Sequence, residues 1–349
     1  MLYFNAASHG MPDPSVYQAM IDFMQVQSES GQVTPTGNEE LLKAKKAVAS
    51  VLSARVDQLG FTSTTTEAWH AVVGSLDLAG KRVLITEHEW GDYYRLLSKR
   101  NDVELQVLPA LDFTKPELSS WEELIDDDVA AIFVPLVTSV GGCRYPIEDI
   151  AALPRPAETK LIVDAAQALG QTEVNVLHLD CDAIISTCRK WLRGPRQTAL
   201  FWINDTWGAE GLSVTASTLA PPDQNEALIV GLGAAVQCLL RRSVEVTEQQ
   251  LITQADELRT WAVSNGIDIY GGANARSAVV SLDLAEASLR NVNRMFSREG
   301  VIGKIVDVSK VEPLQKNDGP SKKILRLSAH IYNSEEELEK LKEVILSAI

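Results

Sequence analysis

The sequence predicts an α/β fold with a mostly parallel sheet. Short apolar runs alternate with amphipathic stretches over the first 200 residues, and this alternation stops after about residue 205. The runs expected to form strands are RVLIT (82–86), AAIFVPL (130–136), KLIVDA (160–165), DAIIST (182–187) and ALFWI (199–203). Buried-looking strands that alternate with helices are typical of a parallel sheet covered on both faces.

Helical patterns flank these strands. Residues 38–53 and 66–78 carry apolar side chains at helical spacing, and residues 231–266 are expected to form long helices. The segment GLGAAV at Gly231 lacks the third glycine and the preceding strand of a dinucleotide fingerprint, so we interpret it as a helix start.

The end of the chain has a different composition of elements. Two plausible strands, residues 277–284 and 324–331, are followed by a charged amphipathic helix over 334–349. This order suits a smaller α+β domain. We therefore expect a large domain over residues 15–230 and a small domain made of residues 1–14 and 231–349.

Composition excludes several classes of function. The 349 residues carry 47 acidic and 32 basic side chains, a net charge of -15, which argues against a nucleic-acid or anionic-membrane partner. The four cysteines form no CxxC pair, so neither a metal site nor a disulfide framework is expected, and a cytoplasmic location fits best. No stretch reaches the roughly 18 apolar residues of a membrane helix, and the N-terminus lacks the pattern of a signal peptide.

Polar residues gather where the predicted strands end. Ligands of open parallel sheets bind outside the carboxyl ends of the strands. The residues that follow these ends include His88, Thr138, Ser139, Asp164, Gln167, Thr187, Arg189 and Lys190. Asp164 follows a strongly apolar run, so we expect its carboxylate to be buried and functional, with a helix N-cap as the alternative.

A second piece is STTTEA (63–68), which opens a helix with three threonines. Hydroxyls and free N–H groups at a helix start suit a phosphate, although simple capping with Glu67 is the alternative. Pyridoxal 5'-phosphate needs a lysine for its aldehyde, a carboxylate for its ring nitrogen and a phosphate-binding site. The predicted edge of the sheet offers these groups, with Lys190 as the lysine, and an imidazole beside them. A solvated surface lysine is the plain alternative for Lys190.

Five blocks resemble the signatures of class V aminotransferases, the superfamily that includes cysteine desulfurases. They are TTTEAWH (64–70), TEHEW (86–90), VDAAQALGQTEVNV (163–176), STCRKWLRGP (186–195) and LRLSAHIYNSEEEL (325–338). The RKWLRGPR form is most similar to the isopenicillin-N-epimerase-like and ergothioneine C–S lyase-like branch. The resemblance implies the fold type I of pyridoxal-phosphate-dependent transferases, with a seven-stranded sheet in the large domain, and a homodimer.

The resemblance also implies roles for individual residues. Lys190 would form the Schiff base and move the proton at the substrate Cα, Asp164 would pair with the pyridine nitrogen, and His88 would stack on the ring. The expected cofactor-binding residues are Thr65, Thr66, Thr187 and Arg189 at the phosphate and Gln167 at the phenolic oxygen. Arg326, with Thr138 and Ser139, would bind the amino-acid substrate; without the resemblance, Arg326 would be taken as a surface charge on an edge strand.

Some positions depart from the family pattern. Arg189 stands where a histidine is frequent, His70 where an asparagine is usual, and Gln197 and Ala199 where glycines are common. Residues 217–227 replace a block that usually contributes to the phosphate site across a dimer interface, so the usual residues for that contact are missing.

The reaction is the least determined feature. Desulfurases of this superfamily use a mobile cysteine near the C-terminal block, and no cysteine follows Cys238. We therefore favour a C–S lyase acting by β-elimination, with transamination and epimerisation as alternatives because all three use the same residues. A catalytically inactive cofactor-binding regulator and a nicotinamide-dependent oxidoreductase are further alternatives, and the missing glycine fingerprint disfavours the latter.

Overall fold

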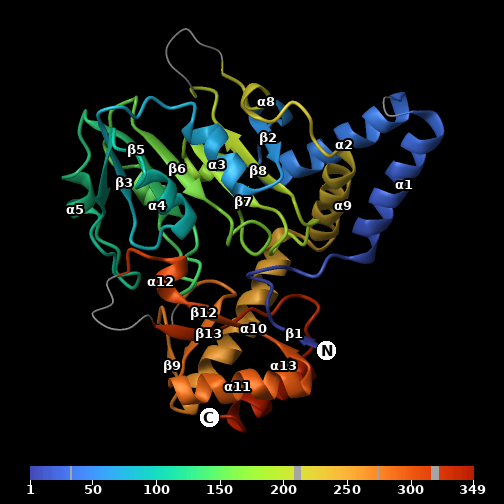
Figure 1. The fold of residues 1–349 in the computed structure, drawn as a ribbon, viewed down its shortest axis with the longest axis vertical. Coiled ribbons are helices and arrows are strands. Elements are labelled where there is room, and N and C mark those ends of the chain that lie inside the picture. Colours follow the sequence, from blue (N-terminus) through green and yellow to red (C-terminus); the bar gives the residue numbers. More distant parts are fainter. Residues whose placement is uncertain (32–33, 208–213, 273–274, 316–321) are drawn as a thin grey trace.

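The fold divides into a large domain and a small domain (Figure 1). It is seen in a computed structural model that describes residues 1–31, 34–207, 214–272, 275–315 and 322–349. The described part of the large domain contains a seven-stranded sheet. In spatial order its strands are β2 (Leu59–Thr62), β8 (Ala199–Ile203), β7 (Ala183–Thr187), β6 (Lys160–Asp164), β5 (Val129–Pro135), β3 (Lys81–Ile85) and β4 (Val103–Val107). Among these strands β8 runs opposite to the other six, so the prediction of a mostly parallel sheet is confirmed.

The central strands are buried on both faces because their apolar residues are continuous. In β5, Ile132 and Val134 join the core on one side of the sheet, whereas Ala131 and Phe133 join the core on the other side. This division follows from the two-residue period of a strand. Continuous rather than alternating hydrophobicity was therefore the correct signal for these strands.

Five of the seven described strands match the predicted runs, and two were missed. β4 is an edge strand with half-exposed side chains, so its apolar pattern is diluted. β2 has only four residues, and one of them is Gly60, whose added Cβ would lie 2.1 Å from the ring of Phe201. A short strand that needs a glycine for close packing carries little strand propensity.

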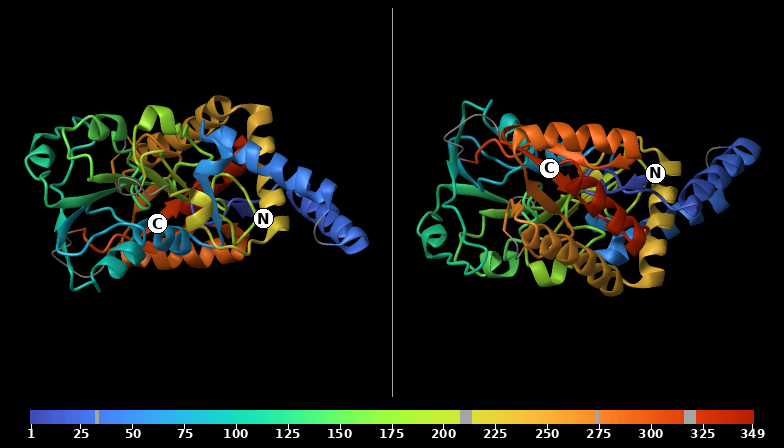
Figure 2. Two further views of the ribbon diagram at one scale, coloured as in Figure 1. Left: turned by 90° about the horizontal axis from the view of Figure 1, so that it is seen from above. Right: turned by 90° about the horizontal axis from the view of Figure 1, so that it is seen from below.

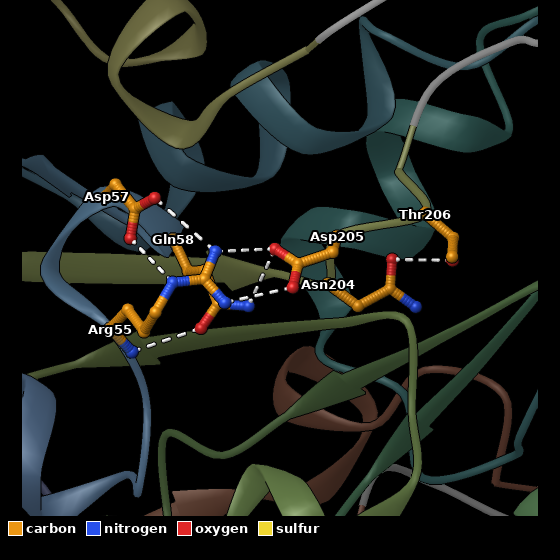
Figure 3. Close-up of polar contacts among 6 residues, drawn as sticks. All are labelled: Arg55, Asp57, Gln58, Asn204, Asp205 and Thr206. Atoms are coloured by element: carbon orange, nitrogen blue, oxygen red, sulfur yellow. Dashed lines mark hydrogen bonds and ion pairs between the residues drawn. The ribbon is translucent and has the colours of Figure 1, made fainter.

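A cluster of polar and charged side chains links the segment before β2 to the segment after β8, at the β2 edge of the sheet (Figure 3). Arg55, which precedes β2, donates to Asp205, which follows β8, with 2.7 Å between Nη2 and Oδ1. Arg55 Nε also donates to Asp57, and Gln58 Nε2 donates to Asp205. The carboxylates of Asp205 and Asp57 raise the pKa of Arg55. The pairs are exposed, so they contribute little to the stability of the domain.

Three long helices lie at one end of the large domain: α1 (Pro14–Ser30), α2 (Pro35–Val51) and α9 (Glu226–Arg242). Two of them, the blue α1 and α2, project from it (Figure 2). Gly233 allows α9 to approach α2, because a Cβ there would lie 2.5 Å from Ala44. The prediction that a helix starts at Gly231 is wrong: α9 starts at Glu226 and is capped by Asn225.

The expected domain boundary at residue 230 falls inside α9. Its side chains as far as Leu239 pack in the core of the large domain. The chain turns at Ser243, which has a φ of 66°, and α10 (Val244–Ser264) leaves α9 at 80°. The interruption of the helix, rather than the change in composition, marks the passage to the small domain.

The small domain contains a four-stranded sheet in its described part, in the order β12 (Lys304–Asp307), β13 (Lys323–Leu327), β10 (Val280–Asp283) and β9 (Asp268–Ile269). It packs against α10, α11 (Glu286–Glu299) and α13 (Glu335–Leu346). The N-terminal β1 (Leu2–Tyr3) pairs with β11 (Val301–Ile302), and Phe4 enters the small-domain core. The first residues therefore cross back to a domain built mainly from the end of the chain.

The remaining elements are short or lie at the rim of the large domain. They are η1 (Val56–Gln58), α3 (Thr65–Val73), α4 (Gly91–Leu97), α5 (Ser119–Glu122), α6 (Ile147–Ala151), α7 (Val176–Leu179), α8 (Ala216–Leu219) and, between the domains, α12 (Val308–Val311). Among the described residues no single helix has the length and apolarity to cross a membrane; the bent pair α9 and α10 meets the test only when taken together.

Candidate active site

A cavity of about 620 Å³ lies where the carboxyl ends of the large sheet face the small domain. Its walls bring together segments that are far apart in the sequence. The residues that line it include Ser8, His9, Thr65, Thr66, His88, Trp90, Ser139, Asp164, Gln167, Thr187, Arg189, Lys190, Lys304 and Arg326. The expected edge of the sheet is therefore the edge that forms the cavity.

Lys190 lies in the turn that follows β7. Its Nζ lies 5.9 Å from the centroid of the Trp90 ring, which also lines the cavity. Burial lowers the pKa of Lys190 to about 7, against the opposing attraction of Asp164. A substantial fraction of this amine is neutral near pH 7, as a nucleophilic or basic lysine requires.

Asp164 ends β6 and opens onto the same cavity. Its Oδ1 accepts a hydrogen bond of 2.7 Å from the Ala166 N–H, and burial raises its pKa while Lys190 opposes the rise. The residues after Asp164 form turns rather than an α-helix, so the N-cap alternative is wrong. The carboxylate is held by a local turn and faces the cavity.

His88 follows β3 and is held by a tyrosine. Its Nδ1 lies 2.8 Å from the Tyr145 hydroxyl, and burial lowers the pKa of His88 to about 4. The imidazole is therefore neutral near pH 7. A neutral aromatic ring that lines the cavity is suited to stack on a flat ligand.

At the start of α3, one threonine caps the helix and the next two line the cavity. Thr64 caps the helix by accepting from the Glu67 N–H, so Thr65 and Thr66 are not needed as caps and line the cavity. On the neighbouring wall, Arg189 Nη1 donates to Thr187 Oγ1 over 2.7 Å. These four residues bring hydroxyls, a guanidinium and a helix N-terminus to one cavity, a chemistry suited to phosphate.

Gln167 has an amide whose orientation is fixed by its neighbours. Its Oε1 accepts from the Trp191 indole N–H over 2.9 Å, and its Nε2 donates to the Ala7 carbonyl over 3.1 Å. Nε2 also lies 3.3 Å from the Ser139 hydroxyl. The donor side of the amide therefore faces the residues of the cavity.

Arg326 lies on the inner strand β13, between β12 and β10, and is 6% exposed. Its Nη1 donates to the Ser139 carbonyl over 2.7 Å and its Nη2 to the Ser8 hydroxyl over 2.8 Å. Burial lowers its pKa to about 10, so the guanidinium stays charged at pH 7. The alternative of a surface charge on an edge strand is wrong.

Thr138 does not line the cavity, so its assignment as a substrate-binding residue is wrong. Its side chain is fully buried, and its Oγ1 accepts from the Cys143 N–H to close the turn after β5. Ser139, the next residue, lines the cavity. Proximity to the end of a strand does not determine on which side a side chain points.

Sequence reasoning missed the N-terminal contribution to this site. Ser8 binds Arg326, and His9 Nε2 accepts from Arg189 Nε over 3.3 Å. Trp90 and Lys304 also line the cavity. Nothing local in the sequence marks these residues, because only the tertiary fold brings them to the strand ends.

The fold and the cavity define a pyridoxal-phosphate-dependent enzyme of fold type I. Asp164 and Lys190 both open onto the cavity, and each shifts the pKa of the other. A carboxylate and an amine in one cavity fit the ring nitrogen and the aldehyde of pyridoxal 5'-phosphate. Thr65, Thr66, Thr187 and Arg189 fit its phosphate.

Comparison with known proteins places the chain in a family. The family model described as aminotransferase class-V matches residues 1–218, and the chain belongs to this family. Cysteine desulfurases of Salmonella newport (strain SL254) and Salmonella typhi are each 25% identical to it over 334 residues, covering 87% of this chain and 81% of theirs. The cofactor is pyridoxal phosphate.

Solved structures share the fold. The apo cysteine desulfurase of Thermococcus onnurineus NA1 superposes with a TM-score of 0.86 at 20% identity, covering 99% of this chain and 94% of that one. The complex of the cystine C–S lyase C-DES with cysteine persulfide gives a TM-score of 0.83 at 16% identity, with 99% and 97% covered. The predicted fold type I is therefore confirmed.

Proposed function

We propose that this enzyme is a C–S lyase that eliminates the β-sulfur of an S-substituted cysteine. The observation that carries the proposal is the position of its four cysteines. Cys143, Cys181 and Cys188 are buried, Cys238 lies in α9, and none of the four lines the cavity. Attack on sulfur by a protein thiol, the step of a persulfide-forming desulfurase, therefore has no candidate residue in this cavity.

The relatives support a reaction at a carbon–sulfur bond. The similar curated proteins are named cysteine desulfurases, and one structural neighbour is described as a cystine C–S lyase. One name describes removal of sulfur from cysteine and the other describes cleavage of a carbon–sulfur bond of cystine. A lyase without the attacking cysteine keeps that bond cleavage and omits persulfide formation.

The residues of the cavity have separate roles in the proposed reaction. The bound cofactor supplies an electron sink for the carbanion that proton loss leaves at Cα. Lys190 Nζ removes the Cα proton, as its lowered pKa allows. Asp164 holds a negative charge at the ring nitrogen, and Arg326 orients the substrate by binding its carboxylate.

In the proposed reaction the Cβ–S bond breaks, and the sulfur leaves with the bonding electron pair and takes up a proton to form a thiol. Addition of water to the remaining fragment gives pyruvate and ammonium. Transamination and epimerisation would use the same residues at Cα, so they remain the alternatives. Neither of them releases a thiol.

The test is incubation with S-methylcysteine and, separately, with alanine plus a keto acid. We expect thiol, pyruvate and ammonium in equal amounts from the first mixture and no new amino acid from the second. Accumulation of pyridoxamine phosphate or of a second amino acid would overturn the lyase in favour of the aminotransferase. Loss of optical rotation without thiol would indicate the epimerase.

We also propose that the enzyme acts as a homodimer. Tyr17, Ile21 and Met24 lie on one face of α1 and are each more than half exposed. Met24 borders an open groove of about 1030 Å³ between α1, α2 and residues 217–227. Sedimentation velocity should give twice the chain mass of 38.2 kDa, and an active species of one chain mass would contradict the proposal.

A further inference from the structure

A fully buried glutamate at the domain interface has no role in the site described so far. Glu312 directly follows α12 and is 0% exposed. Its Oε1 accepts a hydrogen bond of 2.9 Å from the Val140 N–H, whereas its Oε2 has no hydrogen-bond partner in the part of the chain that the structure describes. Burial of a carboxyl group with one oxygen that lacks a hydrogen-bond partner costs free energy. We therefore expect Glu312 to have a specific role.

The contact of Glu312 leads to the substrate side of the cavity. The Val140 N–H and the Ser139 carbonyl belong to the same peptide unit. Glu312 accepts from its N–H, and Arg326 Nη1 donates to its carbonyl over 2.7 Å. Two side chains of the small domain therefore hold opposite sides of one peptide of the large domain.

This geometry couples the two side chains without direct contact. An acceptor at the N–H polarises a peptide and makes its carbonyl a better acceptor, especially in a low dielectric. The acceptor at Val140 therefore strengthens the bond that fixes the guanidinium of Arg326. The second bond of Arg326, to Ser8, places the group beside the cavity.

We propose that Glu312 is a positioning residue for substrate binding: through the Ser139–Val140 peptide it holds Arg326 in the orientation that receives the substrate carboxylate. This inference rests on the proposed function, in which Arg326 binds that carboxylate. The feature that matters is the acceptor oxygen of Glu312. Burial raises the pKa of Glu312 to about 8, and a protonated carboxyl group still offers an acceptor oxygen.

Three variants separate positioning from a general structural contact. Glu312→Gln keeps the size and the acceptor, Glu312→Leu removes the acceptor, and Glu312→Asp withdraws it by one methylene. We expect Glu312→Leu to raise KM about threefold, because the Ser139–Val140 peptide loses the acceptor that helps it to fix Arg326, with kcat unchanged within about twofold. Glu312→Gln should retain the native KM, and Glu312→Asp should fall between the two.

Ser277→Ala is the matched control. Ser277 is also a buried small-domain residue that binds the same turn, because its Oγ donates to the Gly142 carbonyl. It does not touch the Ser139–Val140 peptide. If Ser277→Ala raises KM as much as Glu312→Leu does, or if Glu312→Gln fails to restore KM, the positioning role is wrong.

A binding measurement keeps this inference distinct from the proposed function. Propionate, a carboxylate that cannot react, is titrated into the holoenzyme by calorimetry. Arg326→Gln should abolish propionate binding, and Glu312→Leu should weaken it by about the same factor by which it raises KM. Unchanged binding in Arg326→Gln would refute the carboxylate role of Arg326, whereas loss in Arg326→Gln with native binding in Glu312→Leu would refute the inference about Glu312 alone. If circular dichroism shows that Glu312→Leu does not fold, Glu312→Asp decides the same question.

Discussion

The two walls of the cavity are built in different ways. On the large-domain wall, Lys190, Asp164 and His88 lie at or within three residues of the ends of the parallel strands β7, β6 and β3. On the small-domain wall, Arg326 lies inside β13 of an antiparallel sheet and depends on Ser8 and Ser139 from two other parts of the chain. One wall is set by strand ends and the other by contacts between domains.

This difference separates chemistry from recognition. The groups that act on the cofactor are attached to a sheet that is buried on both faces, so their relative positions are rigid. The group that recognises the substrate is held across a domain interface, where a change in the contacts can alter binding without disturbing the reactive residues. Large-domain variants should therefore change kcat, and small-domain variants should change KM.

The variant with the largest expected effect is Lys190→Ala, which alters the large-domain wall alone. It removes the only amine on the large-domain wall among the described cavity residues. We expect kcat to fall by about a thousandfold or more, because both the covalent link and the proton transfer are lost. Borohydride treatment of the wild type should fix the cofactor on Lys190, as read by mass spectrometry, and the variant should carry no label there.

The converse variant supplies the control for Lys190→Ala. Arg326→Gln should keep the borohydride label on Lys190 while losing affinity for carboxylates, and Lys190→Ala should still bind propionate. A label on another lysine in the wild type would refute the assignment of Lys190. Loss of both properties in either variant would show that the walls are not separable.

The sequence predicted the two walls unequally. The strand ends could be located from apolar runs, and the rule that ligands bind at the carboxyl ends of parallel strands then located Asp164 and Lys190. Arg326 could be assigned only through the family resemblance, because its burial depends on β12 and β10 on either side. Glu312 gave no signal at all, since a glutamate after a four-residue helix is ordinarily exposed.

The errors have the same cause. Thr138 was assigned to the substrate because it follows β5, but the turn points its hydroxyl at the Cys143 N–H. The domain boundary at residue 230 was inferred from composition, but α9 continues in the large-domain core to Leu239. In both cases tertiary packing decided what local sequence could not.

A smaller effect is expected at Glu89, a buried residue of the large domain. Glu89 is buried next to β3 and its Oε1 accepts from the Trp90 N–H over 2.9 Å. Burial, followed by the nearby charge of Asp164, raises the pKa of Glu89 from 4.5 to about 8. Folding therefore favours the protonated form of Glu89.

The sign of the pH dependence follows from this shift. The carboxyl group of Glu89 is compatible with folding at low pH, and its contribution to stability is lost as the pH rises from 4.5 toward 8. Glu89→Gln keeps the acceptor for Trp90 and cannot ionise. Relative to the wild type, its free energy of unfolding should rise by up to about 1.4 kcal/mol per pH unit within this window. Urea unfolding of the holoenzymes at pH 5, 6.5 and 8 measures the difference. A constant difference between wild type and variant would mean that folding does not raise the pKa of Glu89.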